Sequence, residues 1–431
     1  MILNFQRGAK MFKEEKITTK NGVDVYFYKN PSLHSFYISL YLRAGSMFED
    51  HPGITHFLEH ASIRNVDALM GGKLYSTLDR HGIEFNATTY NELVQFYMSG
   101  VCANFDVASE LFAKLLSPII LSPKQIAVER DRIKAEIREG DDATSLSTFI
   151  CNIVHEGTKL SNMITGTIGS VNKINAHLLE DYRKRVENTN NIFFYLTGNF
   201  SDDDIKKLCS EIEKYHVEKG EKNENIAPVC ANFGKRDGRV HIKNASFTML
   251  RFSFDIDMTM VSLAETDIIY DMLFSGYNSL FFIEMSEKRG LCYDISGYIE
   301  KYQNIGELSF SFEVRGGLIY DAVERVVSLL SEFKNTIYDE QSMMKASYVT
   351  NSPLLYDNPS DLNFTFGYDN HVMNEGYDSI DDRARRYASI SPERIRDIAS
   401  LIFRPENLTL ALKGNKKKID QSRLEEIIKK L

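Results

Sequence analysis

Alternating apolar and polar positions predict a β-rich start to the chain. Residues 17–30 are predicted to form a β-hairpin that turns at Asn21-Gly22. Strands and helices then mix without strict β-α-β alternation, which favours an α+β fold. The further strand-like runs are 35–44, 85–101 and 191–196, and the runs of helical periodicity are 103–116, 123–139 and 175–187.

The pattern repeats itself 216 residues further on. The run from Asn191 to Asn199 returns as Asn407 to Asn415, and the strand at 37–46 returns as an alternating run at 253–262. An internal duplication of about half the chain follows. It predicts two homologous α/β-sandwich-type domains, at 1–217 and 239–431, joined by a linker at 218–238 that is rich in Lys, Glu, Asn and Gly.

Residues 49–60 contain a candidate metal-binding motif. His56, Glu59 and His60 spell His-x-x-Glu-His. On an α-helix, positions four residues apart share a face, so the two histidines can direct imidazole nitrogens at one point. Zn²⁺ accepts such ligands and keeps one position open for water, beside which Glu59 would stand as a base. The pattern alone also fits a chance arrangement on a surface helix, so a third ligand is needed.

A second helix offers candidates for that ligand. Residues 122–139 begin with Ser122-Pro123, which is typical of a helix start. Glu129 and Glu136 lie seven residues apart on one face, close to a stripe of isoleucines. Such a carboxylate either flanks the core or has a buried cationic partner. Composition alone also fits an ordinary charged helix with Glu-Arg pairs.

Together these motifs resemble the pitrilysin family of zinc metallopeptidases. Glu136 follows His60 by 76 residues, and six residues separate it from Glu129. The resemblance spans nearly the whole chain. Other matching stretches are Ala44-Gly45-Ser46 with Glu49, Phe85-Asn86-Ala87-Thr88-Thr89, Thr165-Gly166-Thr167-Ile168-Gly169 and 191–199.

The resemblance implies a set of residue roles. His56, His60 and Glu136 are expected to hold one Zn²⁺ per chain, with Glu59 as the general base. Glu129 is expected to orient a ligand histidine, a role that metal-site chemistry also favours.

The resemblance also implies how a substrate is bound. Asn86, Ala87, Thr88 and Thr89 are expected to form an edge strand that takes up an extended peptide by β-augmentation. Without the resemblance, a plain internal strand is the preferred interpretation of these residues.

At the level of the whole protein, the resemblance implies two similar α+β domains per chain. Two chains, or a fused equivalent, are expected to close as a clamshell around a chamber. The expected function is a zinc metalloendopeptidase that hydrolyses short or unfolded peptides, such as a precursor or leader peptide.

The second half departs from the family pattern. It contains no His-x-x-Glu-His, and its isolated His371 is expected to be an exposed loop residue. The family carries an Arg and a Tyr seven residues apart that hold the scissile peptide. Tyr293 matches the Tyr and is expected to be catalytic, but Ser286 occupies the Arg position.

Three explanations of this departure are open: a slow homodimeric peptidase, the zinc-bearing half of a heterodimer with a zinc-less homologue, or a non-catalytic peptide-binding subunit. Retention of all the zinc-site residues argues against the last, because buried carboxylates are costly without metal. The heterodimer is modestly favoured over the homodimer.

Composition and charge bear on the class of protein and on its cellular compartment. The net charge is −9, which does not indicate a nucleic-acid surface, and no apolar run reaches membrane-spanning length. The first ten residues lack the apolar core of a signal peptide. Five scattered cysteines without a Cys-x-x-Cys indicate free thiols, so the cytoplasm is the expected location.

Overall fold

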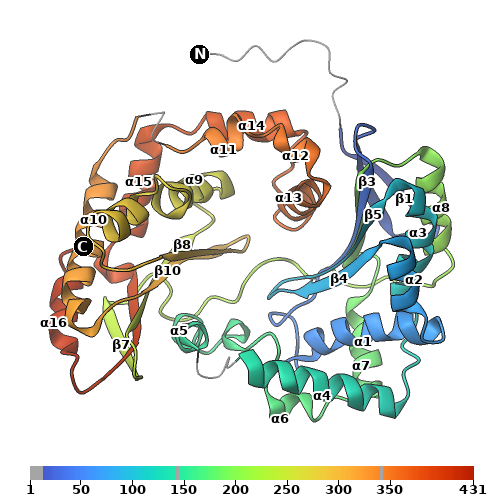
Figure 1. Ribbon diagram of the computed structural model, residues 1–431, viewed down its shortest axis with the longest axis horizontal. Helices are drawn as coiled ribbons and strands as arrows, with labels where there is room; N and C mark the ends of the chain where they lie inside the picture. The colour runs from blue at the N-terminus through green and yellow to red at the C-terminus, as the bar shows by residue number, and fades with distance from the viewer. Residues whose placement is uncertain (1–12, 141–144, 340–342) are drawn as a thin grey trace. The chain divides into compact units, whose positions relative to one another are not determined.

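The computed structural model describes residues 13–140, 145–339 and 343–431 (Figure 1). The first ten residues, considered above for a targeting signal, lie outside this part. The described chain forms two compact units, each built on one sheet. The first unit comprises 13–140, 162–225 and 352–383, and the second comprises 145–161, 226–351 without 340–342, and 384–431.

The sheet of the first unit has the strand order β1-β2-β6-β3-β5-β4. Its neighbours pair antiparallel except for the parallel pair β2 and β6. β1 and β2 form the predicted hairpin. The strands are β1 (Glu15–Thr18), β2 (Asp24–Lys29), β3 (Ser35–Leu42), β4 (Glu84–Thr89), β5 (Val94–Val101) and β6 (Ile192–Gly198).

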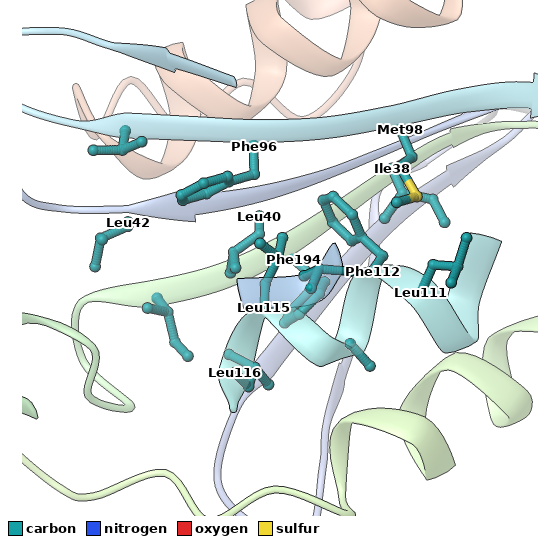
Figure 2. Close-up of a cluster of buried hydrophobic side chains, with 14 of the residues drawn as sticks. Ile38, Leu40, Leu42, Phe96, Met98, Leu111, Phe112, Leu115, Leu116 and Phe194 are labelled. Carbon is teal, nitrogen blue, oxygen red and sulfur yellow. The ribbon is translucent and has the colours of Figure 1, made fainter. Parts of the chain in front are cut away.

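Each face of this sheet packs on helices. Because side chains alternate along a strand, Ile38, Leu40 and Leu42 of β3 all point to one face. There they meet Leu111 and Phe112 of α3 in a buried cluster (Figure 2). The helices are α1 (Ile54–Leu69), α2 (Leu74–His81), α3 (Phe105–Ala113), α4 (Pro123–Gly140), α6 (Ile168–Val171), α7 (Ala176–Val186), α8 (Asp202–Ile212), α12 (Leu354–Asp357) and α13 (Pro359–His371).

The second unit repeats this design without a counterpart of β1. Its strand order is β7-β11-β8-β10-β9, again with one parallel pair, β7 and β11. The elements are β7 (Arg239–Asn244), β8 (Met249–Asp257), β9 (Ser296–Lys301), β10 (Ile305–Glu313), β11 (Leu408–Gly414), α5 (Leu146–Val154), α9 (Leu263–Phe274), α10 (Ile319–Asn335), α11 (Ala346–Val349), α15 (Pro392–Ile402) and α16 (Gln421–Ile428).

The 216-residue offset relates these elements directly. β6 and β11 match residue for residue at this offset, and so do α7 and α15. In the middle of each half, the equivalent strands depart from the 216-residue offset by a few residues. Strand order and offset therefore both support an internal duplication. The remaining helix, α14 (Ile380–Ala388), begins in the first unit and ends in the second.

The compact units differ from the contiguous domains expected at 1–217 and 239–431, because each half lends a helical segment to the other unit. α13, from the second half, covers the face of the first sheet on which Ser39 and Tyr41 lie, and Asn363 of this helix accepts hydrogen bonds from both of their hydroxyls. α5, from the first half, packs on the second sheet against Ala411. The linker expected at 218–238 contains no regular helix or strand, although Arg236 near its end is buried.

Candidate metal centre

The helix that carries His-x-x-Glu-His, α1, has a tightly fixed start. Glu49 accepts hydrogen bonds from the backbone N–H of Gly53 (2.8 Å) and of Thr55 (3.2 Å). Gly53 has φ of 85°, and a Cβ there would lie 2.6 Å from the carbonyl oxygen of Thr165. Only glycine fits this close approach, so Glu49 and the stretch at Thr165-Gly166 position the first turn of the site helix.

The two histidines of α1 and Glu136 of α4 converge. Nε2 of His56 lies 3.5 Å from one oxygen of Glu136, and Nε2 of His60 lies 3.5 Å from the other. Ligand atoms ~2.0–2.1 Å from a tetrahedral Zn²⁺ stand about 3.3 Å from one another. The donor set and its spacing therefore fit zinc. The Glu136 side chain is 48% exposed, which leaves the centre open on one side.

The protonation state of His56 suits a metal ligand. Burial lowers its pKa to about 4, and the neighbouring His60 adds to this effect while Glu59 opposes it. The imidazole is therefore neutral at pH 7, the form that binds metal. Its Nδ1 atom is buried without a hydrogen bond.

Glu59 lies beside the two histidines. One ligand atom each from His56, Glu59 and His60 falls within 4.8 Å of the others. The Glu59 carboxylate accepts a 2.6 Å hydrogen bond from the hydroxyl of Thr89, the last residue of β4. This bond ties the carboxylate to the edge strand, a contact that the sequence analysis did not anticipate.

Glu129 contacts the Nδ1 atom of His60, on the opposite side of the imidazole ring from Glu136. Its fully buried carboxylate lies 3.5 Å from His60 Nδ1, and it accepts hydrogen bonds from Arg64 (2.6 Å) and Arg132 (3.0 Å). Burial opposes ionisation, but contacts with His60 and Arg64 and the charge of Arg132 lower the pKa of Glu129 to about 2. The cationic partners of this buried carboxylate are thus Arg64, whose side chain is 26% exposed, and Arg132, whose side chain is 56% exposed. Their helical spacing from His60 and Glu129 was the signal in the sequence.

Substitution of Glu129 by glutamine is expected to destabilise the metal-free protein by about 2 kcal/mol, since it leaves two arginines beside a neutral group. The folded-state pKa is depressed, so the wild-type advantage is present above the ordinary glutamate pKa of about 4.3 and is lost as the pH falls towards 2. Urea unfolding of both proteins between pH 7 and pH 2.5 measures this difference. A gap that stays constant over that range would contradict it.

The strand expected to bind substrate lies at the edge of its sheet. β4 is last in the strand order and pairs with β5 on one side. Asn86 and Thr88 are exposed, whereas Ala87 is half-buried and Thr89 is buried. The interpretation as an internal strand is therefore wrong, and the open side of β4 presents backbone groups next to Glu59.

Tyr293 and Ser286 belong to the second unit. Ser286 lies in a turn of π-helix, Phe282–Glu287, and its hydroxyl donates to the carbonyl oxygen of Tyr293 at 2.9 Å. The Tyr293 side chain is 95% exposed. Both residues line one pocket of this unit together with Glu313 and Arg315. His371, expected in an exposed loop, instead ends α13 with a side chain that is 14% exposed.

Comparison with known proteins decides the family. Residues 25–168 match the model of the insulinase family, peptidase family M16, and residues 173–346 match the peptidase M16 inactive domain. The chain belongs to peptidase family M16. The match to the inactive domain falls where the second half lacks the metal motif.

Relatives of this M16 chain are named as zinc proteases. An uncharacterized zinc protease of Bacillus subtilis is 20% identical over 92% of this chain and 97% of its own length. Another, from Rickettsia felis, is 24% identical over 78% of this chain and 82% of its own.

Solved structures share the fold. The peptidase M16 inactive domain from Pseudomonas fluorescens superposes with a TM-score of 0.83 at 16% identity, covering 94% of this chain and 98% of that one. Pitrilysin superposes with a TM-score of 0.74 at 17% identity over 100% of this chain and 49% of its own. The M16 chain thus has two domains of the pitrilysin-like kind. None of its helices, within the residues described, is long and apolar enough to cross a membrane.

Proposed function

We propose that this M16 chain is a zinc-dependent endopeptidase that cleaves short or unfolded peptides. The observation that carries the proposal is the convergence of His56, His60 and Glu136 at 3.5 Å spacings, with Glu59 beside them. Three ligands that leave one side open are the pattern of a catalytic zinc site, whereas structural sites are closed by four ligands.

In this proposal His56, His60 and Glu136 hold one Zn²⁺ per chain. When bound, the metal would lower the pKa of a water molecule towards 7 and polarise the peptide carbonyl. Glu59 accepts a proton from that water and returns it to the leaving amine. Thr89 donates to Glu59 and fixes which of its oxygens faces the water, and Glu129 holds the ring of His60 through its Nδ1 atom.

The substrate is proposed to add to β4 as a further strand. The backbone of Asn86 to Thr89 would pair with an extended peptide and place the scissile bond near Glu59, because Thr89 ends the strand and bonds to that carboxylate. Backbone pairing needs an unfolded segment, which supports short peptides, precursors or leader peptides as substrates.

We further propose that the chain works as a dimer that closes around its substrate like a clamshell. Pitrilysin is about twice as long as this chain, which supports two copies or homologues per enclosed chamber. Ser286 in place of the expected Arg favours a partner, a zinc-less homologue that supplies the Arg and Tyr. The cytoplasmic location stays a prediction.

A non-catalytic peptide-binding subunit is the less favoured alternative. All ligand positions, the candidate base and the ionised Glu129 are retained, and a buried carboxylate with two arginines has no evident use without a histidine to hold. If this alternative were true, peptides would bind but never be cleaved, with or without a partner.

Metal dependence tests the proposal. We expect the purified chain to cleave members of a quenched peptide library slowly, to lose this activity with 1,10-phenanthroline, and to regain it with added Zn²⁺. The double variant His56→Ala/His60→Ala should bind one Zn²⁺ fewer and be inactive. Cleavage that persists in the double variant would overturn the assignment.

A further inference from the structure

A second group of metal-binding side chains lies in the second unit, on the face of its sheet that α5 covers. His155, which follows the last residue of α5, faces Glu300 on β9 and Glu307 on β10. One ligand atom from each residue falls within 4.8 Å of the other two. His155 Nε2 is 3.6 Å from an oxygen of Glu307 and 4.0 Å from one of Glu300.

Two polar atoms of this group are buried without hydrogen bonds. The side chains of His155 and Glu307 are 8% and 6% exposed. His155 Nε2, which points at the carboxylates, and Glu307 Oε1 have no hydrogen-bond partner. Buried polar atoms in native proteins are nearly always paired, so an unpaired imidazole nitrogen facing two carboxylates is the arrangement of a cation-binding site. Glu300 is 45% exposed, which gives an ion a route in.

The net charge around the group is negative, which favours a bound cation. Asp255, Glu307 and Glu300 stand opposite one another across β8, β10 and β9. Arg236 pairs with Asp255 through two hydrogen bonds, and Arg251 lies 3.8 Å from Glu307. Among the contacts of the described residues, three carboxylates thus meet two guanidinium groups, and one negative charge is unbalanced when His155 is neutral.

Two of the neighbouring polar side chains, Arg251 and Cys151, make hydrogen bonds elsewhere, whereas the Ser253 hydroxyl is buried without one. Arg251 donates to Ser309 (2.8 Å) and Ser147 (3.1 Å) and approaches the Glu307 oxygen that does not face His155. The Cys151 thiol, one turn before His155, donates to the carbonyl oxygen of Leu160, and burial raises its pKa to about 12. One imidazole and two carboxylates therefore form the donor set, which suits Zn²⁺ or Mn²⁺.

The first unit provides an internal comparison. His371, which ends α13, stands 216 residues after His155 and corresponds to it in the repeat. The strand pair Thr88 and Gln95 of the first sheet corresponds to the strand pair Glu300 and Glu307 of the second sheet. Gln95 is neutral and donates to Ser39 and Tyr41 at 3.0 and 3.1 Å. His371 in turn contacts Glu14 at 3.0 Å. The equivalent position in the first unit is thus satisfied by hydrogen bonds, whereas Glu307 Oε1 and His155 Nε2 of the second unit have no hydrogen-bond partner.

We propose that His155, Glu300 and Glu307 form a second, structural metal site that binds a divalent cation of the zinc or manganese type. The bound ion links α5, which comes from the first half of the chain, to β9 and β10 of the second half. The site shares no residue with the candidate peptidase centre, and its existence does not depend on the proposed function.

Zinc binding to the full chain tests this site once the histidine ligands of the candidate peptidase centre have been removed. In the His56→Ala/His60→Ala background, metal-stripped protein is titrated with Zn²⁺ by calorimetry, and its thermal midpoint is recorded with and without the metal. We expect one equivalent to bind with a Kd of about 1 µM or below and to raise the midpoint by several degrees.

Glu307→Gln in this background reproduces the glutamine of the first unit. Loss of a direct ligand should weaken binding by about 100-fold or more and remove the thermal shift. Glu300→Gln, at a half-exposed position where folding is not at stake, should weaken binding in the same way. His177→Ala is the matched control, because His177 and Asp181 form an exposed pair that holds no buried site, and binding should be unchanged.

Two results would overturn the proposal. One is a background protein that binds no Zn²⁺ or Mn²⁺ at these concentrations, which would identify the group as a cluster of ion pairs rather than a metal site. The other is binding that both glutamine variants leave intact, which would place the metal elsewhere.

Discussion

Glu59→Gln is expected to lower kcat for peptide hydrolysis by about 1000-fold while zinc binding through His56 and His60 is retained. Glutamine keeps the shape of the side chain and can still accept the hydrogen bond from Thr89, but it cannot take a proton from water. KM should change little, because the substrate strand β4 is untouched. Cleavage assays together with metal analysis of the same preparation measure both effects.

The control for this variant is Glu110→Gln, an exposed carboxylate on α3 that pairs with Lys114. It should leave kcat within a factor of two of the wild type, since exposed ion pairs contribute little. A Glu59→Gln protein that cleaves at the wild-type rate would remove Glu59 from the mechanism. A protein that loses both zinc and activity would make Glu59 a ligand rather than a base.

Ser286→Arg is expected to raise the cleavage rate of the chain on its own by about 100-fold. The resemblance to the pitrilysin family places an Arg at this position, seven residues before Tyr293, and one preorganised donor to the developing oxyanion typically contributes a factor of 10² to 10³. The serine hydroxyl now bonds to the backbone of Tyr293, so the substitution loses one hydrogen bond in the second unit. Peptide cleavage at saturating substrate measures the change in kcat.

Ser286→Lys is the matched comparison, because lysine brings the same charge without the planar pair of donors. It should recover less of the rate than arginine. A rise that disappears in the Ser286→Arg/Tyr293→Phe double variant would show that the two residues act together. No rise at all, in a protein that folds and binds zinc, would separate this chain from the arginine-dependent mechanism.

Part of the arrangement around His56 could be predicted because its information is local. Helical periodicity places His56 and His60 one turn apart, and the same periodicity places Glu129 and Glu136 on one face of α4. The internal duplication follows from the recurrence of similar segments at the 216-residue offset. These features need no knowledge of distant contacts.

What the sequence did not predict depends on contacts across the chain. The hydrogen bond from Thr89 to Glu59 and the ion pair of Arg64 with Glu129 arise from tertiary packing. The exchange of α5 and α13 between the two units is likewise not encoded in local periodicity, because an amphipathic helix does not specify which sheet it covers. The 216-residue offset also places His155 and His371 at the same position of the repeat.

The exchanged helices bear on how the protein arose and how it can be divided. A half-chain that folded alone would leave one sheet face without its helix, so the ancestral single copy would have completed itself by swapping that helix with a second copy. For the same reason, a cut within 218–238 would not release two independent domains: the two pieces would remain associated, as in a split protein whose fragments complement each other.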